Sequence, residues 1–262
     1  MSRPHAAGRQ GKFLLSQGLG PMSPQYAKTS GNLVLLRLTS ADLALLQPHF
    51  TLVELRAGKS LETPNRRIEH AYFLNGGLAL VVANGRDDHS IEVGLVGREG
   101  FTGLPIVMGT DRSPNSTFMQ SGGNALKISR ANLTRAMQRS ETLRRALLNF
   151  GHTFLIQTSQ TALANGSSRN EQRLARWLCM AHDRSDDDDV VLTHESLSVM
   201  LSTQRPQVSL ILEAFRNAGI LRAKRGRISI LDRKLLERSA GGAYGIAEAE
   251  FQRLFGVRAP RA

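Results

Sequence analysis

Two short segments with helical periodicity meet at a tight joint near Leu201, and they constrain the fold more than any other feature. In the first, Leu197, Met200 and Leu201 follow one another at the spacing that places side chains on one helix face. The second carries Pro206 in its first turn, where the missing N–H is a donor that a helix leaves unsatisfied in any case. This arrangement is typical of a helix-turn-helix, whose second helix enters the major groove of DNA.

The second segment, over residues 203–217, separates an apolar side from a polar side. Four apolar residues recur at intervals of three and four and are expected in the domain core: Val208, Ile211, Leu212 and Phe215. The polar residues at its beginning are the candidates for reading base edges: Gln204, Arg205, Gln207 and Ser209. An Arg side chain pairs bidentately with guanine, and a Gln side chain pairs in the same way with adenine. An ordinary surface hairpin of helices is the alternative interpretation.

Contacts with DNA phosphates are expected from both helix starts and from a basic hairpin that follows them. Thr193 and Thr203 are predicted to cap the two helices. The run 220–231 has two β-like segments around a Gly-containing turn, which predicts a hairpin. From residue 203 to residue 238, nine Lys and Arg residues outnumber three Asp and Glu residues, which suits a wing lying along phosphates. The residues expected to contact phosphate are Thr193, Thr203, Lys224, Arg225 and Arg227.

The segment 193–221 resembles the DNA-binding domain of the Crp-Fnr family of bacterial transcription regulators, and the resemblance extends over residues 35–238. The stretch RNEQRLARWLCMAH, residues 169–182, is similar to the helix that opens this family's C-terminal domain. The resemblance implies that Arg205 and its polar neighbours lie in the major groove. Leu210 departs from the family pattern, in which a polar base-contacting residue is frequent at this position. Its side chain either touches a thymine methyl group or packs within the protein.

Short strand-like runs separated by Gly and Asn fill the chain between residues 38 and 130. The candidate strands are residues 50–55, 71–74, 78–83, 91–96, 117–120 and 125–128. Many short strands with Gly-rich turns favour a β-sandwich or a barrel. Their spacing, together with the turn at residues 97–100, resembles the cyclic-nucleotide-type β-roll of the same family. The expected fold class is α+β, with a jelly-roll-like double-stranded β-roll, a long helix and a C-terminal winged helix-turn-helix.

The resemblance also implies an effector pocket in the β-roll, and its residues depart from the family pattern. Members that bind cyclic nucleotides hold the ribose with a Gly-Glu pair and the phosphate with an Arg followed by Ser or Thr. Here Leu104 follows Gly103 in place of Glu, and Asn115 precedes Ser116 and Thr117 in place of Arg. Loss of the Arg removes a strong charge-assisted contact, and a nearby loop arginine is a weak substitute. We therefore expect either a different small effector or none, and no cyclic AMP or GMP.

Residues 141–164 are a candidate for one long helix, on the order of 35 Å in length. In the family that the chain resembles, the matching helix pairs with its symmetry mate. The residues expected to hold a homodimer are Leu143, Leu147, Phe150 and Phe154. Two recognition helices about 34 Å apart then read successive major grooves. The alternative is a helix that packs only on its own β-roll.

Composition limits the remaining classes of function. The net charge of +12 favours an anionic partner, although RNA or anionic lipid satisfies it as well as DNA does. No apolar run approaches the roughly 18 to 20 residues that span a bilayer, so no membrane partner is expected. The single cysteine, Cys179, is expected to be a small buried hydrophobe in a reduced, cytoplasmic protein. The scattered histidines and the acidic run 186–189 lack metal-ligand spacing, so we expect neither a metal nor a cofactor.

These patterns predict a disordered basic tail (1–30), a β-roll sensor domain (31–139), a dimerisation helix (140–165), a winged helix-turn-helix domain (166–238) and a C-terminal tail (239–262). An overextended gene start explains the first thirty residues equally well. We expect a sequence-specific regulator that binds two-fold-symmetric double-stranded DNA as a homodimer, with RNA polymerase and an unknown small effector as further candidate partners. The rival is a signalling module with nonspecific affinity for nucleic acid. An enzyme is disfavoured, since no nucleophile–base set or phosphate-binding Gly loop is present.

Overall fold

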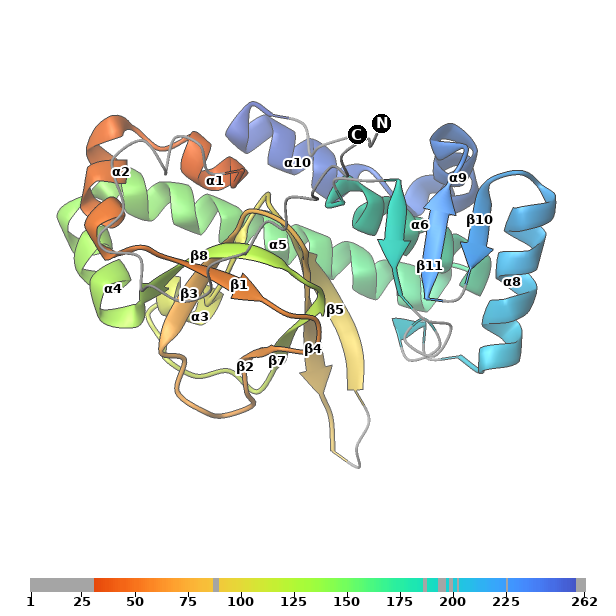
Figure 1. Ribbon diagram of the computed structural model, residues 1–262, viewed down its shortest axis with the longest axis horizontal. Coiled ribbons are helices and arrows are strands. Elements are labelled where there is room, and N and C mark those ends of the chain that lie inside the picture. The colour runs from red at the N-terminus through yellow and green to blue at the C-terminus, as the bar shows by residue number, and fades with distance from the viewer. Residues whose placement is uncertain are drawn as a thin grey trace, which may run out of the picture.

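The computed structural model describes residues 31–86, 90–185, 188–192, 197, 200–201, 203–224 and 226–257. The predicted basic tail, the predicted cap Thr193 and the wing residue Arg225 lie outside these residues. The described chain passes through a β-roll, a long helix and a C-terminal helical domain with a small sheet (Figure 1). The α+β fold class expected from the sequence is therefore confirmed.

The β-roll consists of two four-stranded antiparallel sheets. The first has the order β1 (Thr51–Leu55), β8 (Gly123–Ser129), β3 (His70–Leu74) and β6 (Phe101–Thr102). The second has the order β2 (Ser60–Glu62), β7 (Ser116–Ser121), β4 (Leu78–Asn84) and β5 (Ser90–Val96). Phe73, Leu126 and Met119 are almost fully buried and join the two sheets into one core. All the strands predicted for the β-roll are present. The strands β2 and β6 were not predicted, because they span only three and two residues, too few to show an alternating pattern.

Short helices surround the β-roll: α1 (Leu33–Leu36), α2 (Ser40–Leu46), η1 (Gln47–His49), α3 (Leu104–Val107) and α4 (Arg130–Arg139). These helices were not predicted from the sequence, although three of them, α1, α2 and α4, begin at side-chain caps, namely Asn32, Thr39 and Ser129. The Thr39 hydroxyl accepts a hydrogen bond from Asp42 N at 3.1 Å, and the Ser129 hydroxyl accepts one from Asn132 N at 3.3 Å. A hydroxyl cap of this kind stabilises a helix by about 1 kcal/mol, which is enough to fix where such short helices begin.

The long helix α5 (Glu141–Ser167) passes behind the β-roll and leads into the C-terminal domain (Figure 1). Ser140 caps it, since the Ser140 hydroxyl accepts a hydrogen bond from Leu143 N at 3.1 Å. One side of α5 packs on the β-roll and is buried there, including Leu143, Leu147 and Phe150. The helix continues two residues beyond the predicted dimerisation helix (140–165), to Ser167, and Ser168 is its C-cap.

The C-terminal domain packs several helices on a three-stranded sheet. Its elements are α6 (Asn170–Asp183), β9 (Asp189–Val191), α8 (Arg205–Asn217), β10 (Leu221–Lys224), β11 (Arg227–Ile230) and α9 (Arg233–Ala240). Between β9 and α8, Leu201 N donates to Leu197 O at 2.9 Å, which is the backbone bond of the expected first helix. Cys179 is fully buried in α6, as predicted, and burial raises the pKa of its thiol to about 12.

The C-terminal segment folds back along α5 and is not a separate tail (Figure 1). It forms η2 (Gly241–Ala243) and α10 (Ile246–Phe255), within the segment that the sequence assigned to a C-terminal tail. Ala247, Phe251 and Phe255 recur every fourth residue and are buried on one side of α10. Because this apolar stripe needs a partner surface, α10 packs against α5 and the β-roll core.

Candidate functional site

The helix α8 begins without a side-chain cap. Gln204 is the residue at its N-cap position, and the Gln204 side chain makes no capping hydrogen bond. The prediction that Thr203 caps this helix is wrong, because the helix starts one residue too late for Thr203 to reach it in the usual geometry. The Thr203 hydroxyl instead lies 3.3 Å from Asn170 Nδ2, which donates a hydrogen bond to it. Pro206 lies in the first turn, as the sequence indicated.

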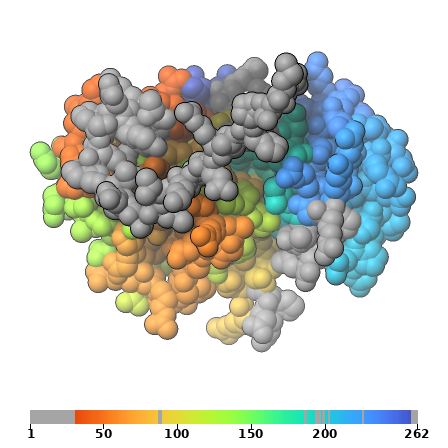
Figure 2. Space-filling view, viewed as in Figure 1, coloured from red at the N-terminus to blue at the C-terminus, as the bar shows by residue number. Residues whose placement is uncertain are grey.

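The predicted base-reading residues share the exposed side of α8. All four are exposed to solvent: Gln204, Arg205, Gln207 and Ser209. The opposite side is buried in the domain core through the four apolar residues that the sequence singled out. Leu210 is 62% exposed, so the alternative in which it packs within the chain is excluded. In the space-filling view α8 forms the surface at the edge away from the β-roll (Figure 2).

The hairpin of β10 and β11 has one polar and one apolar face. Arg222 pairs with Ser229 and Lys224 pairs with Arg227 across the two strands, so these four side chains lie on the same face. Lys224 and Arg222 are exposed, and Arg222 is a cation that the sequence analysis did not assign to the wing. Arg227 forms an ion pair of 2.7 Å with Asp189 on β9, so part of its charge is already compensated. Arg222 could have been predicted from the sequence, because residues two positions apart on a strand share a face and Arg222 lies two positions before Lys224.

The β-roll carries a cavity of about 220 Å³ next to α3 that is partly open to solvent, which we call the β-roll cavity. Four of the five residues predicted for an effector pocket line it: Gly103, Leu104, Asn115 and Thr117. Ser116 is not among the lining residues, because successive side chains of β7 point to opposite faces of the sheet. The loop arginine considered as a phosphate ligand, Arg112, is 64% exposed and lies beside Asp111, outside this lining.

Three further polar residues line the β-roll cavity and were not predicted from the sequence: Glu62, Thr102 and Ser113. Glu62 on β2 is buried, and its Oε1 accepts a hydrogen bond from Gly103 N at 2.7 Å. Gly103 has a φ of 87°, a left-handed conformation that Gly adopts without strain and that aims its N–H at Glu62. Burial raises the pKa of the Glu62 carboxyl, against the opposing effect of hydrogen bonds from Gly103 and Thr117. Thr102 lies on β6, and the Ser113 hydroxyl accepts a hydrogen bond from Asn115 N at 3.1 Å.

The residues predicted to hold a homodimer are not on the exposed side of α5. Leu143, Leu147 and Phe150 are at most 2% exposed, and Phe154 is partly buried in the same core. The prediction that Leu143, Leu147 and Phe150 form the dimer contact is therefore wrong, because the β-roll and α10 cover that side of the helix, whereas Phe154 is only partly covered. The exposed side carries a different apolar row, with Leu148 and Leu155 exposed by 41% and 59%.

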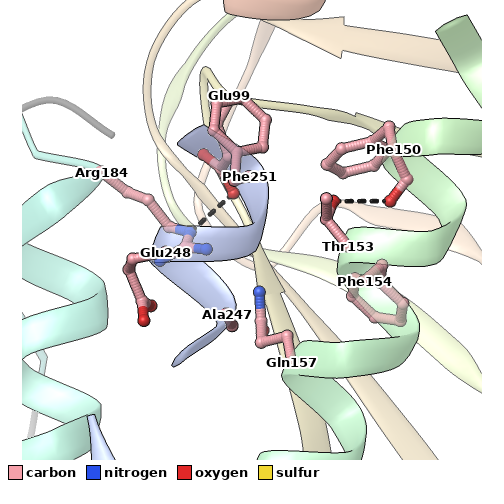
Figure 3. A pocket seen from close by; sticks show the side chains of 9 residues that line it. All are labelled: Glu99, Phe150, Thr153, Phe154, Gln157, Arg184, Ala247, Glu248 and Phe251. Carbon is pink, nitrogen blue, oxygen red and sulfur yellow. Dashed lines mark hydrogen bonds and ion pairs between the residues drawn. The ribbon is translucent and has the colours of Figure 1, made fainter. Parts of the chain in front are cut away.

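The β-roll and the C-terminal domain meet at a buried polar junction. Arg184, just after α6, donates from Nε to Glu99 Oε1 at 2.7 Å, and both side chains are 6% exposed. Figure 3 shows Arg184 and Glu99 pointing toward one another beside aromatic rings of α5 and α10. Nearby, Trp177 Nε1 donates a hydrogen bond to Glu92, and burial raises the pKa of the Glu92 carboxyl to about 7. The junction cavity measures about 20 Å³, which leaves room for roughly one water molecule.

The acidic run is only partly described. Asp189 belongs to β9 and pairs with Arg227, and Asp188 lies 3.2 Å from His182 Nε2. Across the described residues, no three His, Cys, Asp or Glu side chains are grouped so as to hold a metal ion. Within the same ranges, no helix combines the length and apolar character needed to cross a bilayer.

Comparisons with known proteins agree with this geometry. Residues 172–239 match a family model described as a Crp-like helix-turn-helix domain. A regulator of the crp/fnr family from Eubacterium rectale superposes with a TM-score of 0.62 at 16% identity, over 79% of this chain and 97% of that chain. FixK2 from Bradyrhizobium japonicum superposes with a TM-score of 0.64 at 16% identity, over 74% of this chain and 98% of that chain. A CRP-family regulator from Thermus thermophilus superposes with a TM-score of 0.62 at 18% identity, also over 74% of this chain and 98% of that chain. No curated protein sequence matches the chain.

Proposed function

We propose that this chain, which has the fold of the Crp/Fnr transcription regulators and carries a Crp-like helix-turn-helix domain, binds specific DNA sequences and regulates transcription. The observation that carries the proposal is the beginning of α8. There, Arg205 and Gln207 are exposed side chains of the type that pairs with guanine and adenine, on a helix whose other side is buried. The exposed Lys224 and Arg222 of the adjacent hairpin supply charge for the phosphate backbone.

We also propose that the active form is a homodimer that pairs along the exposed side of α5. Leu148, Leu155 and Ala162 are exposed and spaced by seven residues, with Thr158 between the last two, so they form a seam of the kind seen in paired helices. The buried hydroxyl of Thr158 has no hydrogen-bond partner among the described residues. A second copy would cover this seam and bring two α8 helices into register with successive major grooves, about 34 Å apart.

The experiment that tests the proposed function is selection of bound duplexes from a random pool. A regulator is expected to prefer its selected sequence over random DNA by about a thousandfold or more at physiological salt. A nonspecific basic protein would show steep salt dependence and no such preference. Equal affinity for the selected and random duplexes would contradict the proposal.

Replacing Arg205 by Ala is expected to weaken binding to the selected duplex by about 1 to 3 kcal/mol and to relax the base preference at one position of each half-site. The loss should be confined to duplexes with the preferred base, since a lost base contact does not affect the others. Arg216→Ala is the matched control, because Arg216 is an exposed Arg at the other end of α8, 3.1 Å from Glu213. Equal losses for all sequences with Arg205→Ala would contradict a base-reading role.

Replacing Lys224 and Arg222 together by Ala is expected to weaken all duplexes similarly, because phosphate contacts carry no sequence information. Each lost phosphate contact should reduce the slope of log affinity against log salt by about 0.9. The measurement is a salt titration of the variant and of Lys59→Ala, which removes an exposed positive charge from the β-roll. If the slope of the double variant equals that of Lys59→Ala, the wing does not contact phosphate.

A further inference from the structure

The β-roll cavity holds two polar groups with unused bonding capacity. Thr102 is 2% exposed and lines the cavity, and its hydroxyl has no hydrogen-bond partner among the described residues. A buried hydroxyl without a partner destabilises the folded protein, so a ligand that hydrogen-bonds to it gains binding free energy. Glu62, whose Oε1 is held by Gly103, brings a carboxyl group to the same cavity. Both residues therefore offer acceptor oxygens to a bound molecule.

The charge of the lining opposes an anionic ligand. Among the described residues that line the cavity, Glu62 is the one ionisable side chain, and no Arg or Lys accompanies it. A phosphate placed here would meet a carboxyl group in a desolvated site and would lack the charge-assisted donors that hold phosphates in proteins. An ammonium group, in contrast, finds acceptors in Glu62 and Thr102 and an opposite charge in the Glu62 carboxylate.

The size and the walls of the cavity limit the rest of the ligand. Apolar side chains supply much of the lining, including Phe101, Leu104, Met108 and Phe154. Its volume of about 220 Å³ exceeds that of a cavity of about 150 Å³ that binds benzene. A single ring with a short side arm fits this space.

We propose that the β-roll cavity binds a small amine: a cationic head group that donates hydrogen bonds to Glu62 and Thr102, on an apolar or aromatic body. Because Phe154 belongs to α5 and lines the cavity, the occupant touches the helix that leads to the C-terminal domain. This link gives the ligand a route to DNA binding, and only this regulatory consequence rests on the proposed function. The binding itself is a property of the protein alone.

The test is calorimetric titration of the full chain, without DNA, by a panel of matched pairs. The amines are benzylamine, 2-phenylethylamine and tryptamine, and their counterparts are benzoate, phenylacetate and indole-3-acetate, with cyclic AMP and cyclic GMP added. We expect at least one amine to bind at least tenfold more tightly than its carboxylate and than either nucleotide. The proposal is overturned if no amine exceeds its counterpart, or if a cyclic nucleotide binds best. Failure to bind DNA would leave this result unaffected.

Two variants separate recognition from a structural role. Glu62→Gln keeps an acceptor for Gly103 N and removes the charge. It should lower the affinity for the tightest-binding amine by about ten- to a hundredfold. Thr102→Val removes the unpaired hydroxyl at nearly constant shape, so the melting temperature should be unchanged or higher while amine affinity falls about three- to tenfold. Thr110→Val, at an exposed position outside the cavity, is the control and should alter neither. Unchanged amine affinity in Glu62→Gln and Thr102→Val would contradict the assignment.

Discussion

Replacing Glu99 by Ala is expected to lower the free energy of unfolding by about 3 to 5 kcal/mol, because Arg184 would remain as a buried charge without its partner. The pair is 6% exposed on both sides, and Glu99 also accepts hydrogen bonds from Gly97 N at 3.2 Å. Arg184 cannot give up its proton, and its bond to Met180 O at 2.7 Å keeps it from swinging into solvent. The variant therefore loses an ion pair and gains an uncompensated charge at the junction of the two domains.

The measurement is urea-induced unfolding of the variant beside two controls. Glu213→Ala removes the same kind of side chain from an exposed pair with Arg216, and exposed pairs contribute about 0 to 1 kcal/mol. The double variant Glu99→Met with Arg184→Met removes both charges, and it should recover most of the stability lost in Glu99→Ala. If Glu99→Ala costs no more than Glu213→Ala, the junction does not contribute to stability in the way that its burial indicates.

Much of the fold follows from local patterns in the sequence. Short strand-like runs separated by Gly and Asn predicted the six longer strands, and apolar residues spaced by three and four predicted α5, α6 and α8. The turn at Gly226, with a φ of 75°, and the helix end at Gly219, with a φ of 73°, were predictable as well, because Gly favours such left-handed conformations. Each of these features depends on residues that are neighbours in the chain.

The features that the sequence did not reveal depend on contacts between distant residues. Glu62 reaches the cavity because Gly103, 41 positions away, donates to it, and Glu99 meets Arg184 across 85 positions. Nothing local distinguishes either carboxylate from a surface residue. The error on α5 has another cause. Leu143 and Leu148 both belong to apolar rows, and a helix with two such rows does not indicate which one its own domain covers.

Replacing Leu148 and Leu155 together by Glu is expected to convert the proposed dimer into a monomer and to lower affinity for a two-fold-symmetric duplex by about 10² to 10⁴, the usual gain from linking two binding sites. Both side chains are exposed in the single chain, so their replacement should leave its folding intact, which circular dichroism would check. Sedimentation measures the mass, and titration of a full site and a half-site measures the affinity.

The control for this variant is Leu163→Glu, because Leu163 is 59% exposed, as is Leu155, and lies on the same helix. Eight residues separate the two, so Leu163 lies roughly 80° around the helix from the seam. Its replacement should leave the dimer and the full-site affinity unchanged. Affinity for the half-site should be similar in all three proteins, since α8 and its hairpin are untouched. A double variant that still sediments as a dimer, or a Leu163→Glu variant that dissociates, would exclude the seam of Leu148 and Leu155 as the contact that pairs two α8 helices on DNA.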